Sequence, residues 1–350
     1  MRVGFLLEQC LAPVPGGTGR YSRELALALN RTRPVGASVR GVTAWHRSRL
    51  ALPGIEVERL PLPRRALIAA WQRGLGPGLS GDVIHTPTPL HPGRGRLVVT
   101  VHDAVPWTHP ETMTRRGVAW HRTMIERAGR SAALVVVPTQ AVAEELAHHV
   151  PLRDLLVLGE GVSEDLRLPP DAAERAHRME LPERFLLTVS TLEPRKGLAE
   201  LITALKHVPK IPLLCVGQLG WGEVSVADLA TAAGVEARVL GRVPDPDLAV
   251  LLHHATALVV PSRSEGFGLP LLEGMAAGTP VLTSDAAALV EVAGGAALSV
   301  PLADLVDGLR QITGDAALRA RLAAAGPVRA AAFTWDGAAA RLWRAYGDLP

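Results

Sequence analysis

The sequence predicts a parallel α/β protein of two domains, and three observations support this fold class. Short apolar runs alternate with longer amphipathic runs from one end of the chain to the other, which is the pattern of parallel strands joined by crossover helices. The chain has 350 residues, more than one hydrophobic core usually serves. A polar, proline-rich stretch at 159–183 separates two such alternations. We therefore predict domains at 1–166 and 167–332 and a separate tail at 333–350.

The first half of the chain contains four apolar runs with the length of strands. The predicted strands are Val3–Leu7, Asp82–His85, Leu97–His102 and Ala133–Pro138. The predicted helices are Gly19–Asn30, Arg64–Gly74, Arg115–Gly129 and Ala141–His149. The helix from Arg64 begins with two arginines and continues with an apolar face. This face either packs on the sheet or lies on a membrane surface.

The second half repeats the alternation. Its predicted strands are Phe185–Ser190, Ile211–Gly217, Ala237–Leu240, Ala257–Pro261 and Pro280–Ser284. Its predicted helices are Leu198–His207, Val226–Ala233, Asp247–Ala255 and Pro270–Ala277. The tail predicts one more amphipathic helix, with Thr334 as its N-cap and with Leu342, Trp343 and Tyr346 on its buried face.

Composition limits the classes of partner. The net charge is +3, but residues 1–166 hold 20 Arg, no Lys and 14 Asp or Glu, which gives +6. Such a basic half attracts phosphorylated or anionic-lipid partners, although arginines spread over ordinary surface give the same count. No basic run is interleaved with enough aromatic residues to indicate nucleic-acid binding.

The cysteines and the apolar runs indicate the compartment. Cys10 and Cys215 lie far apart in or beside apolar runs, which is typical of reduced, buried thiols in the cytosol. The first apolar run is too short for a signal peptide, and the sequence has no uncharged apolar window of the length of a membrane span. We expect a cytoplasmic protein, with peripheral contact with the inner face of the membrane as an alternative.

The most informative motif runs from Ser262 to Glu273, between two predicted strands. It places Glu265 and Glu273 eight residues apart around a glycine-bearing loop. Pro270 suits the first turn of a helix, because its missing N–H would be unpaired there anyway. The backbone N–H groups of 266–269 are then expected to point at an anion, most plausibly a diphosphate. Glu273 is expected in the first turn of the helix and Glu265 before it, so both carboxylates can accept hydrogen bonds from hydroxyl groups beside the anion. Two such acceptors next to a bound diphosphate describe a sugar-nucleotide site.

Three further motifs stand at the ends of predicted strands. Gly16 and Gly17 precede the first helix, without the G-x-G-x-x-G spacing of a dinucleotide fingerprint. Arg195 and Lys196 precede a helix of the second domain and are suited to neutralise a leaving diphosphate. His102, followed by Asp103, and His85 end strands of the first domain, where a histidine either binds a sugar or acts as acid or base, or has a structural role.

No metal site is predicted. Asp245-Pro246-Asp247 has the D-x-D form of a metal clip, but it lies in a proline-rich turn directly before an apolar helix. We therefore interpret Asp247 as an N-cap. The sequence has no group of His and Cys residues at zinc-binding spacing.

Together these motifs resemble the retaining glycosyltransferases of family four, whose two Rossmann-like domains form the GT-B arrangement. The matching segments, which span nearly the whole chain, are Gly16-Gly17, His102-Asp103, Val137-Pro138-Thr139, Glu193 to Gly197, Gly241-Arg242-Val243, Glu265 to Glu273, Gly278 to Val281 and the tail helix. The resemblance implies parallel sheets facing across a cleft, with the tail helix crossing back to the first domain. The first domain then binds the acceptor and the second the donor. Leu192 to Lys196 and His102-Asp103 resemble the branch rich in mannosyltransferases.

Residue roles follow from the same resemblance. Glu273 is expected to bind the ribose of the donor and Glu265 the transferred hexose. Backbone groups of Gly266, Phe267, Gly268 and Leu269 are expected to bind its sugar and phosphate. Arg195 and Lys196 then stabilise the diphosphate, Gly16 and Gly17 contact it, Arg242 and Val243 edge the base, and His102 touches the sugar. His85 and Asp103 are acceptor-binding candidates. The chain departs from many relatives at Ser190-Thr191, where they carry an arginine that Arg195 replaces in our interpretation.

The resemblance implies a hexosyltransferase that moves a hexose, with retention, to a hydroxyl of a glycan, glycolipid or small molecule in polysaccharide or glycolipid assembly. It implies no metal and no cofactor beyond the donor. GDP-mannose is the favoured donor, ahead of UDP-glucose and deoxythymidine-diphosphate sugars. Three other classes stay open: an epimerase or phosphorylase on the same scaffold, a non-catalytic nucleotide-sugar-binding protein and, least favoured, a nicotinamide oxidoreductase.

Overall fold

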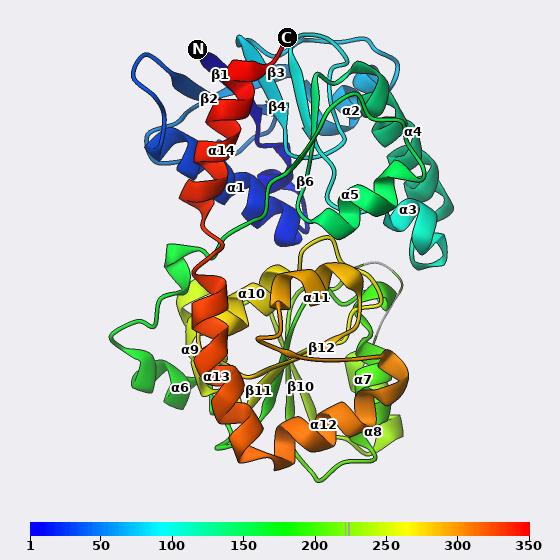
Figure 1. Cartoon of the computed structure of the whole chain (residues 1–350), viewed down its shortest axis with the longest axis vertical. Helices are drawn as coiled ribbons and strands as arrows, with labels where there is room; N and C mark the ends of the chain where they lie inside the picture. The colour runs from blue at the N-terminus through cyan, green and yellow to red at the C-terminus, as the bar shows by residue number, and fades with distance from the viewer. Residues whose placement is uncertain (221, 223–224) are drawn as a thin grey trace. The chain divides into compact units, whose positions relative to one another are not determined.

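The computed structural model describes residues 1–220, 222 and 225–350, which form two compact units. Unit 1 comprises Met1–Glu160 together with Thr334–Pro350, and unit 2 comprises Gly161–Phe333 (Figure 1). The boundary expected after residue 166 falls at the end of the short helix η3 (Glu164–Leu166). The observed boundary lies slightly earlier, because unit 2 begins at Gly161. The assignment of acceptor to unit 1 and donor to unit 2 stays a prediction.

Unit 1, all of whose residues are described, is built on a seven-stranded parallel sheet of order β3-β2-β1-β4-β5-β6-β7. The strands are β1 (Arg2–Leu6), β2 (Ser38–Trp45), β3 (Glu56–Pro63), β4 (Val83–Thr86), β5 (Leu97–Thr100), β6 (Leu134–Val137) and β7 (Leu155–Val157). Strands β4, β5 and β6 are buried along their whole length, as expected of parallel strands covered on both faces. The strand order reverses between β1 and β4, and ligands of such sheets bind at the carboxyl ends of strands beside this point.

The helices of unit 1 connect these strands. They are α1 (Gly16–Arg31), α2 (Arg64–Gln72), α3 (Val105–Thr108), α4 (Arg115–Ser131), α5 (Gln140–Ala147) and α14 (Trp335–Asp348), with the short helices η1 (Glu8–Leu11) and η2 (Pro110–Thr112). The apolar side chains of α2, Leu67 and Trp71, are fully buried in a cluster with β1 and β2. The apolar face of α2 therefore packs inside unit 1 and is not available to a membrane.

The tail helix belongs to unit 1, as the resemblance implied. Thr334 caps α14 by accepting a hydrogen bond from the backbone N–H of Gly337, and the expected buried residues Leu342, Trp343 and Tyr346 are buried. Figure 1 shows α14, in red, beside α1. The indole N–H of Trp343 donates to the carbonyl of Leu29 in α1 at 3.1 Å.

Unit 2, as far as it is described, contains a six-stranded parallel sheet of order β10-β9-β8-β11-β12-β13. Its strands are β8 (Leu186–Val189), β9 (Leu213–Val216), β10 (Ala237–Gly241), β11 (Ala257–Val260), β12 (Val281–Ser284) and β13 (Leu298–Val300). Its helices are α6 (Ala172–Arg178), α7 (Leu198–Leu205), α8 (Val226–Ala233), α9 (Asp245–His254), α10 (Leu269–Ala276), α11 (Ala287–Ala293), α12 (Leu305–Gly314) and α13 (Ala316–Ala330), besides η3, η4 (Pro194–Lys196) and η5 (Leu302–Asp304).

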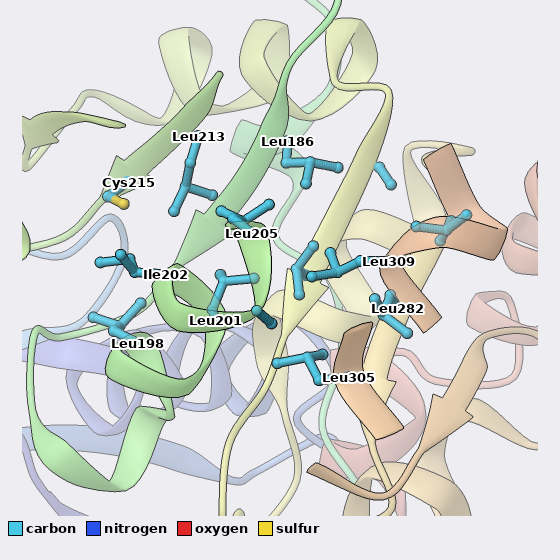
Figure 2. Packing of buried hydrophobic residues seen from close by; sticks show 14 of the residues in the cluster. Leu186, Leu198, Leu201, Ile202, Leu205, Leu213, Cys215, Leu282, Leu305 and Leu309 are labelled. Atoms are coloured by element: carbon cyan, nitrogen blue, oxygen red, sulfur yellow. The ribbon is translucent and has the colours of Figure 1, made fainter. Parts of the chain in front are cut away.

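The core of unit 2 joins its sheet to helices on one face. Figure 2 shows Leu186 and Leu213 from β8 and β9 with Leu201 and Leu205 from α7 in one cluster of buried side chains. Leu309 of α12 and Leu282 of β12 extend the same cluster. This packing fixes the strand ends from which the loops of the candidate site emerge.

The sequence analysis missed several elements. In unit 1 it missed β2, β3, β7 and α3, and in unit 2 it missed β13, α6, α11, α12 and α13. Strand β3 contains two prolines and is only partly buried, and β7 and β13 have only three residues each, none fully buried. These edge strands lack the continuous apolar run on which the predictions relied. The strands that carry the candidate site, β8 and β11, were both predicted, whereas β2 was missed although it lies between β3 and β1 and is not an edge strand.

Candidate active site

The candidate site of unit 2 lies where its strand order reverses, between β8 and β11. These two strands are hydrogen-bonded neighbours. The loop after β8 carries Arg195 and Lys196 in η4, and the loop after β11 carries Glu265. The backbone N–H of Arg263 donates to the carbonyl of Arg195 at 2.9 Å and ties the two loops together. Two segments far apart in sequence thus meet at the position that ligands occupy in such sheets.

Glu265 is the centre of a hydrogen-bonded ionic cluster. Its Oε1 accepts from Lys196 Nζ at 2.7 Å and from Ser262 Oγ at 2.7 Å. Its Oε2 lies 3.5 Å from Arg195 Nη1. The side chains of Glu265, Lys196 and Arg195 are 10%, 13% and 18% exposed. The cluster is therefore largely desolvated but still reaches the surface of the unit.

The charges of the cluster keep Glu265 ionised. Burial raises the pKa of Glu265, but the charges of Lys196 and Arg195, with the hydrogen bonds from Lys196 and Ser262, outweigh it. The pKa of this carboxyl therefore lies below its ordinary value. At neutral pH the cluster presents an acceptor-only carboxylate beside an ammonium group.

Arg195 and Lys196 have different surroundings. Arg195 donates to the carbonyl of Ser264 at 2.9 Å and to Glu193 Oε1 at 3.2 Å, so groups of the loops themselves hold it on two sides. The ammonium group of Lys196 makes one hydrogen bond to the described residues, to Glu265, and it has three donors. Lys196 therefore has donors left for a ligand, whereas the contacts of Arg195 fix the shape of the loops.

The backbone of this site requires glycine at position 197. Gly197 has a φ of +67°, in the left-handed region, where glycine is favoured. A Cβ atom built on it would lie 1.9 Å from the carbonyl oxygen of Pro261, at the end of β11. The loop that carries Lys196 thus approaches the end of β11 as closely as only a glycine allows, which brings Lys196 to Glu265.

The start of α10 supplies the second half of the predicted donor site. Gly268 precedes the helix with a φ of +91°, and Pro270 occupies its first turn, as predicted. Gly266 and the side chains of Phe267 and Leu269 are buried. Their predicted contact with a donor therefore concerns the backbone N–H groups alone.

Glu273 differs from the prediction in one respect. The first turn of α10 contains no acidic residue, because the helix begins at Leu269 and Glu273 is its fifth residue. Glu273 is 4% exposed. Glu273 therefore lies in the second turn of α10, further from the N-terminus of the helix than the sequence analysis placed it.

Arg242 and Val243 follow β10, which is the edge strand of the sheet and is separated from β8 by β9. Arg242 is exposed and Val243 half-buried. The structure does not bring these two residues into contact with the cluster around Glu265, and their role at the base stays a prediction.

The interpretation of Asp247 as an N-cap was wrong. Helix α9 begins at Asp245 and Pro244 is its N-cap. Asp247 lies inside the first turn and accepts hydrogen bonds from Arg175 at 2.7 Å and Arg178 at 3.2 Å. These ion pairs attach α6 to α9. Within the described residues there is no group of three or more His, Cys, Asp or Glu residues arranged to hold a metal ion.

In unit 1, His102 follows β5 and is hydrogen-bonded to one acceptor, with a carboxylate on its other side. Its Nε2 lies 2.9 Å from the carbonyl oxygen of Pro87, and its Nδ1 lies 3.9 Å from Glu160 Oε1. Burial lowers the pKa of His102, although the Pro87 carbonyl and Asp103 oppose this shift. Asp103 accepts a hydrogen bond from the backbone N–H of Val105 at 3.2 Å, so its carboxylate binds the backbone at the start of α3.

His85 is a structural residue rather than an acceptor-binding one. It is fully buried, with its Nδ1 2.5 Å from the hydroxyl of Tyr346 and its Nε2 2.9 Å from Thr100 Oγ1. Both ring nitrogens are thus engaged by α14 and β5. Burial lowers the pKa of His85 from 6.5 to about 3, so it is neutral in the folded protein.

The glycine pair lies in a helix instead of a loop. Helix α1 begins at Gly16, three residues earlier than predicted, so Gly16 and Gly17 form its first turn. Both are exposed, and Gly16 has a φ of +59°. Their contact with a diphosphate stays a prediction, now as part of a helix start at the carboxyl end of β1.

Three residues that support the site were missed by the sequence analysis: Ser262, which donates to Glu265, Glu193, which holds Arg195, and Glu160, which faces His102. Ser262 and Glu193 lie within three residues of a predicted site residue, so local spacing was the available signal. Glu160 lies far from His102 in sequence and gave no such signal.

No helix among the described residues combines the length and the apolar composition needed to cross a membrane.

Cys10 and Cys215 are free cysteines that form no disulfide. Burial raises the pKa of Cys10 to about 11 and that of Cys215 to about 12, so both thiols are protonated at neutral pH.

Comparison with known proteins identifies the family. Residues 171–329 match the family described as "Glycosyl transferases group 1", and residues 15–166 match "Glycosyltransferase Family 4". The O-antigen chain mannosyltransferase B of Escherichia coli is 30% identical over 83% of this chain and 79% of its own length. The phosphatidyl-myo-inositol mannosyltransferase of Mycobacterium leprae is 28% identical over 99% of this chain and 96% of its own length.

Solved structures agree with this fold. Sucrose-phosphate synthase from Thermosynechococcus elongatus superposes with a TM-score of 0.80 at 22% identity and covers 100% of this chain and 99% of its own. HepE of Anabaena, solved with UDP and glucose, superposes with a TM-score of 0.77 at 20% identity and covers 100% of both chains. At these identities the likeness shows a shared fold, two Rossmann-like domains with parallel sheets. The chain therefore belongs to glycosyltransferase family 4 and has the GT-B fold.

Proposed function

We propose that this glycosyltransferase moves mannose from GDP-mannose to a hydroxyl group of its acceptor, with retention of the α configuration and without a metal ion. The observation that carries the proposal is the 2.7 Å contact of Lys196 Nζ with Glu265 Oε1 at the ends of β8 and β11. It places one carboxylate and one ammonium group side by side. These are the two groups needed for the hydroxyls of a sugar and for the adjoining phosphate.

The choice of mannose is supported by the relatives. Both curated relatives described above carry the name of a mannosyltransferase. The superposed HepE was solved with UDP and glucose, so UDP-glucose is the main competing donor. Deoxythymidine-diphosphate sugars come behind both.

The proposed chemistry follows from the charges. The bond between the anomeric carbon and the phosphate oxygen breaks, and negative charge develops on the departing diphosphate. Lys196 and the backbone N–H groups at the start of α10 stabilise this charge, because fixed donors need no reorganisation during the reaction. The acceptor oxygen bonds to the anomeric carbon on the same face, and its proton passes to a phosphate oxygen of the leaving group.

In this proposal Glu265 positions the transferred hexose and the ammonium group of Lys196. Its Oε1 accepts from Lys196 and Ser262, and its ionised carboxylate retains capacity for the hydroxyls of the hexose. Arg195, held by Glu193 and Ser264, keeps the two loops in register and adds positive charge. Glu273 is proposed to bind the ribose and His102 the transferred sugar. Arg242 and Val243 are proposed to edge the base.

The acceptor is proposed to be a glycan, glycolipid or small molecule bound by unit 1, in polysaccharide or glycolipid assembly in the cytoplasm. Two relatives' names specify phosphate-bearing acceptors: the phosphatidyl-myo-inositol mannosyltransferase and the D-inositol 3-phosphate glycosyltransferase of Mycobacterium avium, which is 32% identical over 58% of this chain. Contact with the inner face of the membrane is compatible with the first of these.

A panel of sugar nucleotides tests the donor. Thermal stabilisation is expected with GDP-mannose and not with UDP-glucose or deoxythymidine-diphosphate glucose. Addition of EDTA should change neither this stabilisation nor the release of GDP during turnover. Proton NMR of the product should show an α-mannoside. Stabilisation by UDP-glucose alone would show that UDP-glucose, and not GDP-mannose, is the donor. A β-linked product would contradict retention. Conversion of the donor to an epimer in the absence of an acceptor would indicate an epimerase.

A further inference from the structure

Unit 1 contains a cavity that none of the predicted site residues lines. It has a volume of about 590 Å³, is open to solvent and lies at the start of α4. Its polar lining is Arg115, Arg122 and Glu111, and Pro110, Met113 and Val118 form most of its apolar wall. The cavity belongs to the carboxyl edge of the sheet, because η2 and α4 follow α3, and α3 follows the His102-Asp103 loop after β5.

Arg122 is held in place before any ligand arrives. Its Nε donates to the carbonyl of Pro106 at 2.9 Å. Its guanidinium carbon lies 5.9 Å from the centroid of the Trp107 ring, and Trp107 stacks on His149 with ring centroids 5.3 Å apart and an angle of 6°. A guanidinium fixed by a carbonyl and an aromatic face loses little further freedom when it binds a ligand.

The two arginines of this cavity have no ion-pair partner in the part of the chain that the structure describes. Among the described residues no carboxylate lies within 4.0 Å of the guanidinium of Arg115 or Arg122. Other arginines of unit 1 do have such a partner, as Arg2 has in Asp82 and Arg40 in Glu56. The terminal nitrogens of Arg122 and the whole guanidinium of Arg115 are therefore donors that residues 1–220, 222 and 225–350 do not use.

The spacing and the lining define the ligand. Arg115 and Arg122 are seven residues apart, so they lie on the same face of α4. Two guanidinium groups suit a phosphate, which accepts several charge-assisted hydrogen bonds and carries up to two negative charges. The apolar wall suits a hydrocarbon next to that phosphate. We propose that this cavity binds a phosphate ester that serves as the acceptor. The assignment of the ligand as the acceptor rests on the function proposed above.

Hexyl phosphate is a suitable probe, because it joins a phosphate to a short hydrocarbon. Calorimetric titration should show binding to the wild-type protein and none of hexanol. Arg115→Gln, at an exposed residue without a hydrogen bond to the described residues, should fold and lower the affinity at least about tenfold. Arg122→Gln should do the same, and Arg122→Lys should recover only part of the affinity because lysine lacks the planar fork.

Arg130→Gln is the matched control, since it removes the same charge from the exposed last turn of α4. It should bind hexyl phosphate as the wild type does. The proposal is overturned by absence of binding to the wild type, by unchanged affinity in Arg115→Gln, or by an equal loss in Arg130→Gln, which would reveal only a general attraction by positive charge.

Displacement of hexyl phosphate distinguishes the source of the phosphate. Displacement by mannose 1-phosphate assigns a water-soluble acceptor, and displacement by phosphatidylglycerol vesicles but not by phosphatidylcholine vesicles assigns a lipid headgroup. Displacement by neither would overturn the assignment to an acceptor. Thermal stabilisation by GDP-mannose, measured on the same proteins, should persist in Arg115→Gln. If GDP-mannose fails to stabilise the wild type while hexyl phosphate binds, the proposed function fails and the phosphate site stands.

Discussion

Two polar networks lie at strand ends of this molecule, and they differ in charge and in access to solvent. In unit 2, Lys196, Arg195 and Glu265 form a charged cluster whose side chains are 10–18% exposed. In unit 1, Tyr346, His85, Thr100 and Tyr21 form a neutral chain of hydrogen bonds with almost no exposed surface. The first network has donors left over, whereas in the second both ring nitrogens of His85 are engaged.

This difference supports the proposed binding role of the first network and a structural role for the second. A desolvated ion pair is weak evidence for stability, so a charged cluster that reaches the surface points to ligand binding. A closed neutral network satisfies its buried polar groups and connects the elements that carry them. Here it connects α14 to β4, β5 and α1. We therefore expect changes in the unit 2 cluster to act on catalysis and changes in the unit 1 network to act on stability.

Acidification provides the largest expected effect. Burial lowers the pKa of His85 from 6.5 to about 3, so the unfolded chain binds a proton below pH 6.5 that the folded protein does not bind. Stability therefore falls as the pH falls from 6.5 toward 3. Between pH 6.5 and 4.5 this amounts to about 2–3 kcal/mol for one histidine. Urea unfolding of the wild type and of His85→Gln at pH 7.0, 6.0 and 5.0 should show a shallower pH dependence in the variant.

The network of unit 2 should not contribute in this range. The pKa of Glu265 lies below its ordinary value of 4.5, so its contribution to stability is complete above pH 4.5 and is lost only as the pH falls through its pKa in the folded protein. Glu265→Gln should leave the slope between pH 7.0 and 5.0 unchanged. Equal slopes in the wild type and in His85→Gln would show that His85 is not the buried neutral group.

Lys196→Ala tests the catalytic side of the comparison. It removes the ammonium group that contacts Glu265 and that is proposed to stabilise the leaving diphosphate. Hydrogen bonds to charged groups contribute about 1.5–3 kcal/mol, so kcat/KM, measured by GDP release, should fall about ten- to hundredfold. Lys206→Ala, at an exposed residue after α7, is the control. A folded Lys196→Ala protein with wild-type kcat/KM would remove Lys196 from the site.

Tyr346→Phe tests the structural side. It removes the hydroxyl that contacts His85 Nδ1 and leaves a buried ring nitrogen without its partner, which costs about 1–2 kcal/mol. The free energy of unfolding at pH 7 should fall by this amount, while kcat/KM of the folded protein stays unchanged. A tenfold loss of kcat/KM at unchanged stability would mean that α14 acts on the chemistry and would break the distinction between the two networks.

The sequence predicted one network better than the other, and the reason is physical. Lys196 and Glu265 come directly after buried central strands, and the order of parallel strands brings such residues to one edge. The common edge was therefore predictable from local pattern, whereas the direct contact of Lys196 with Glu265 was not predicted and comes from the structure. His85 lies near the end of β4 and His102 follows β5, and nothing local in the sequence distinguishes their roles. Only the return of α14, which places Tyr346 on His85, shows that His85 is structural.

Helix boundaries limited the prediction in the same way. Gly16 and Gly17 suggested a loop because glycine is unfavourable in helices, yet α1 begins at Gly16. Asp247 suggested an N-cap, yet contact with Arg175 of α6 holds it inside the first turn of α9. In both cases the terminal residue depends on packing with other segments. The strands on either side of the candidate site were predictable, while these helix ends, the interior strand β2 and the edge strands β3, β7 and β13 were not.

Arg263→Gln is expected to have the smallest effect and sharpens the comparison most. Arg263 lies two residues before Glu265, but its side chain pairs with Glu200 and is 44% exposed. Exposed ion pairs contribute at most about 1 kcal/mol, so the free energy of unfolding should change by less than that amount. Its backbone N–H, which contacts Arg195, is kept in the variant. If positive charge near Glu265 were sufficient for catalysis, kcat/KM would fall as in Lys196→Ala. An unchanged kcat/KM would show that the position of the ammonium group against Glu265, and not the local charge, carries the function of unit 2.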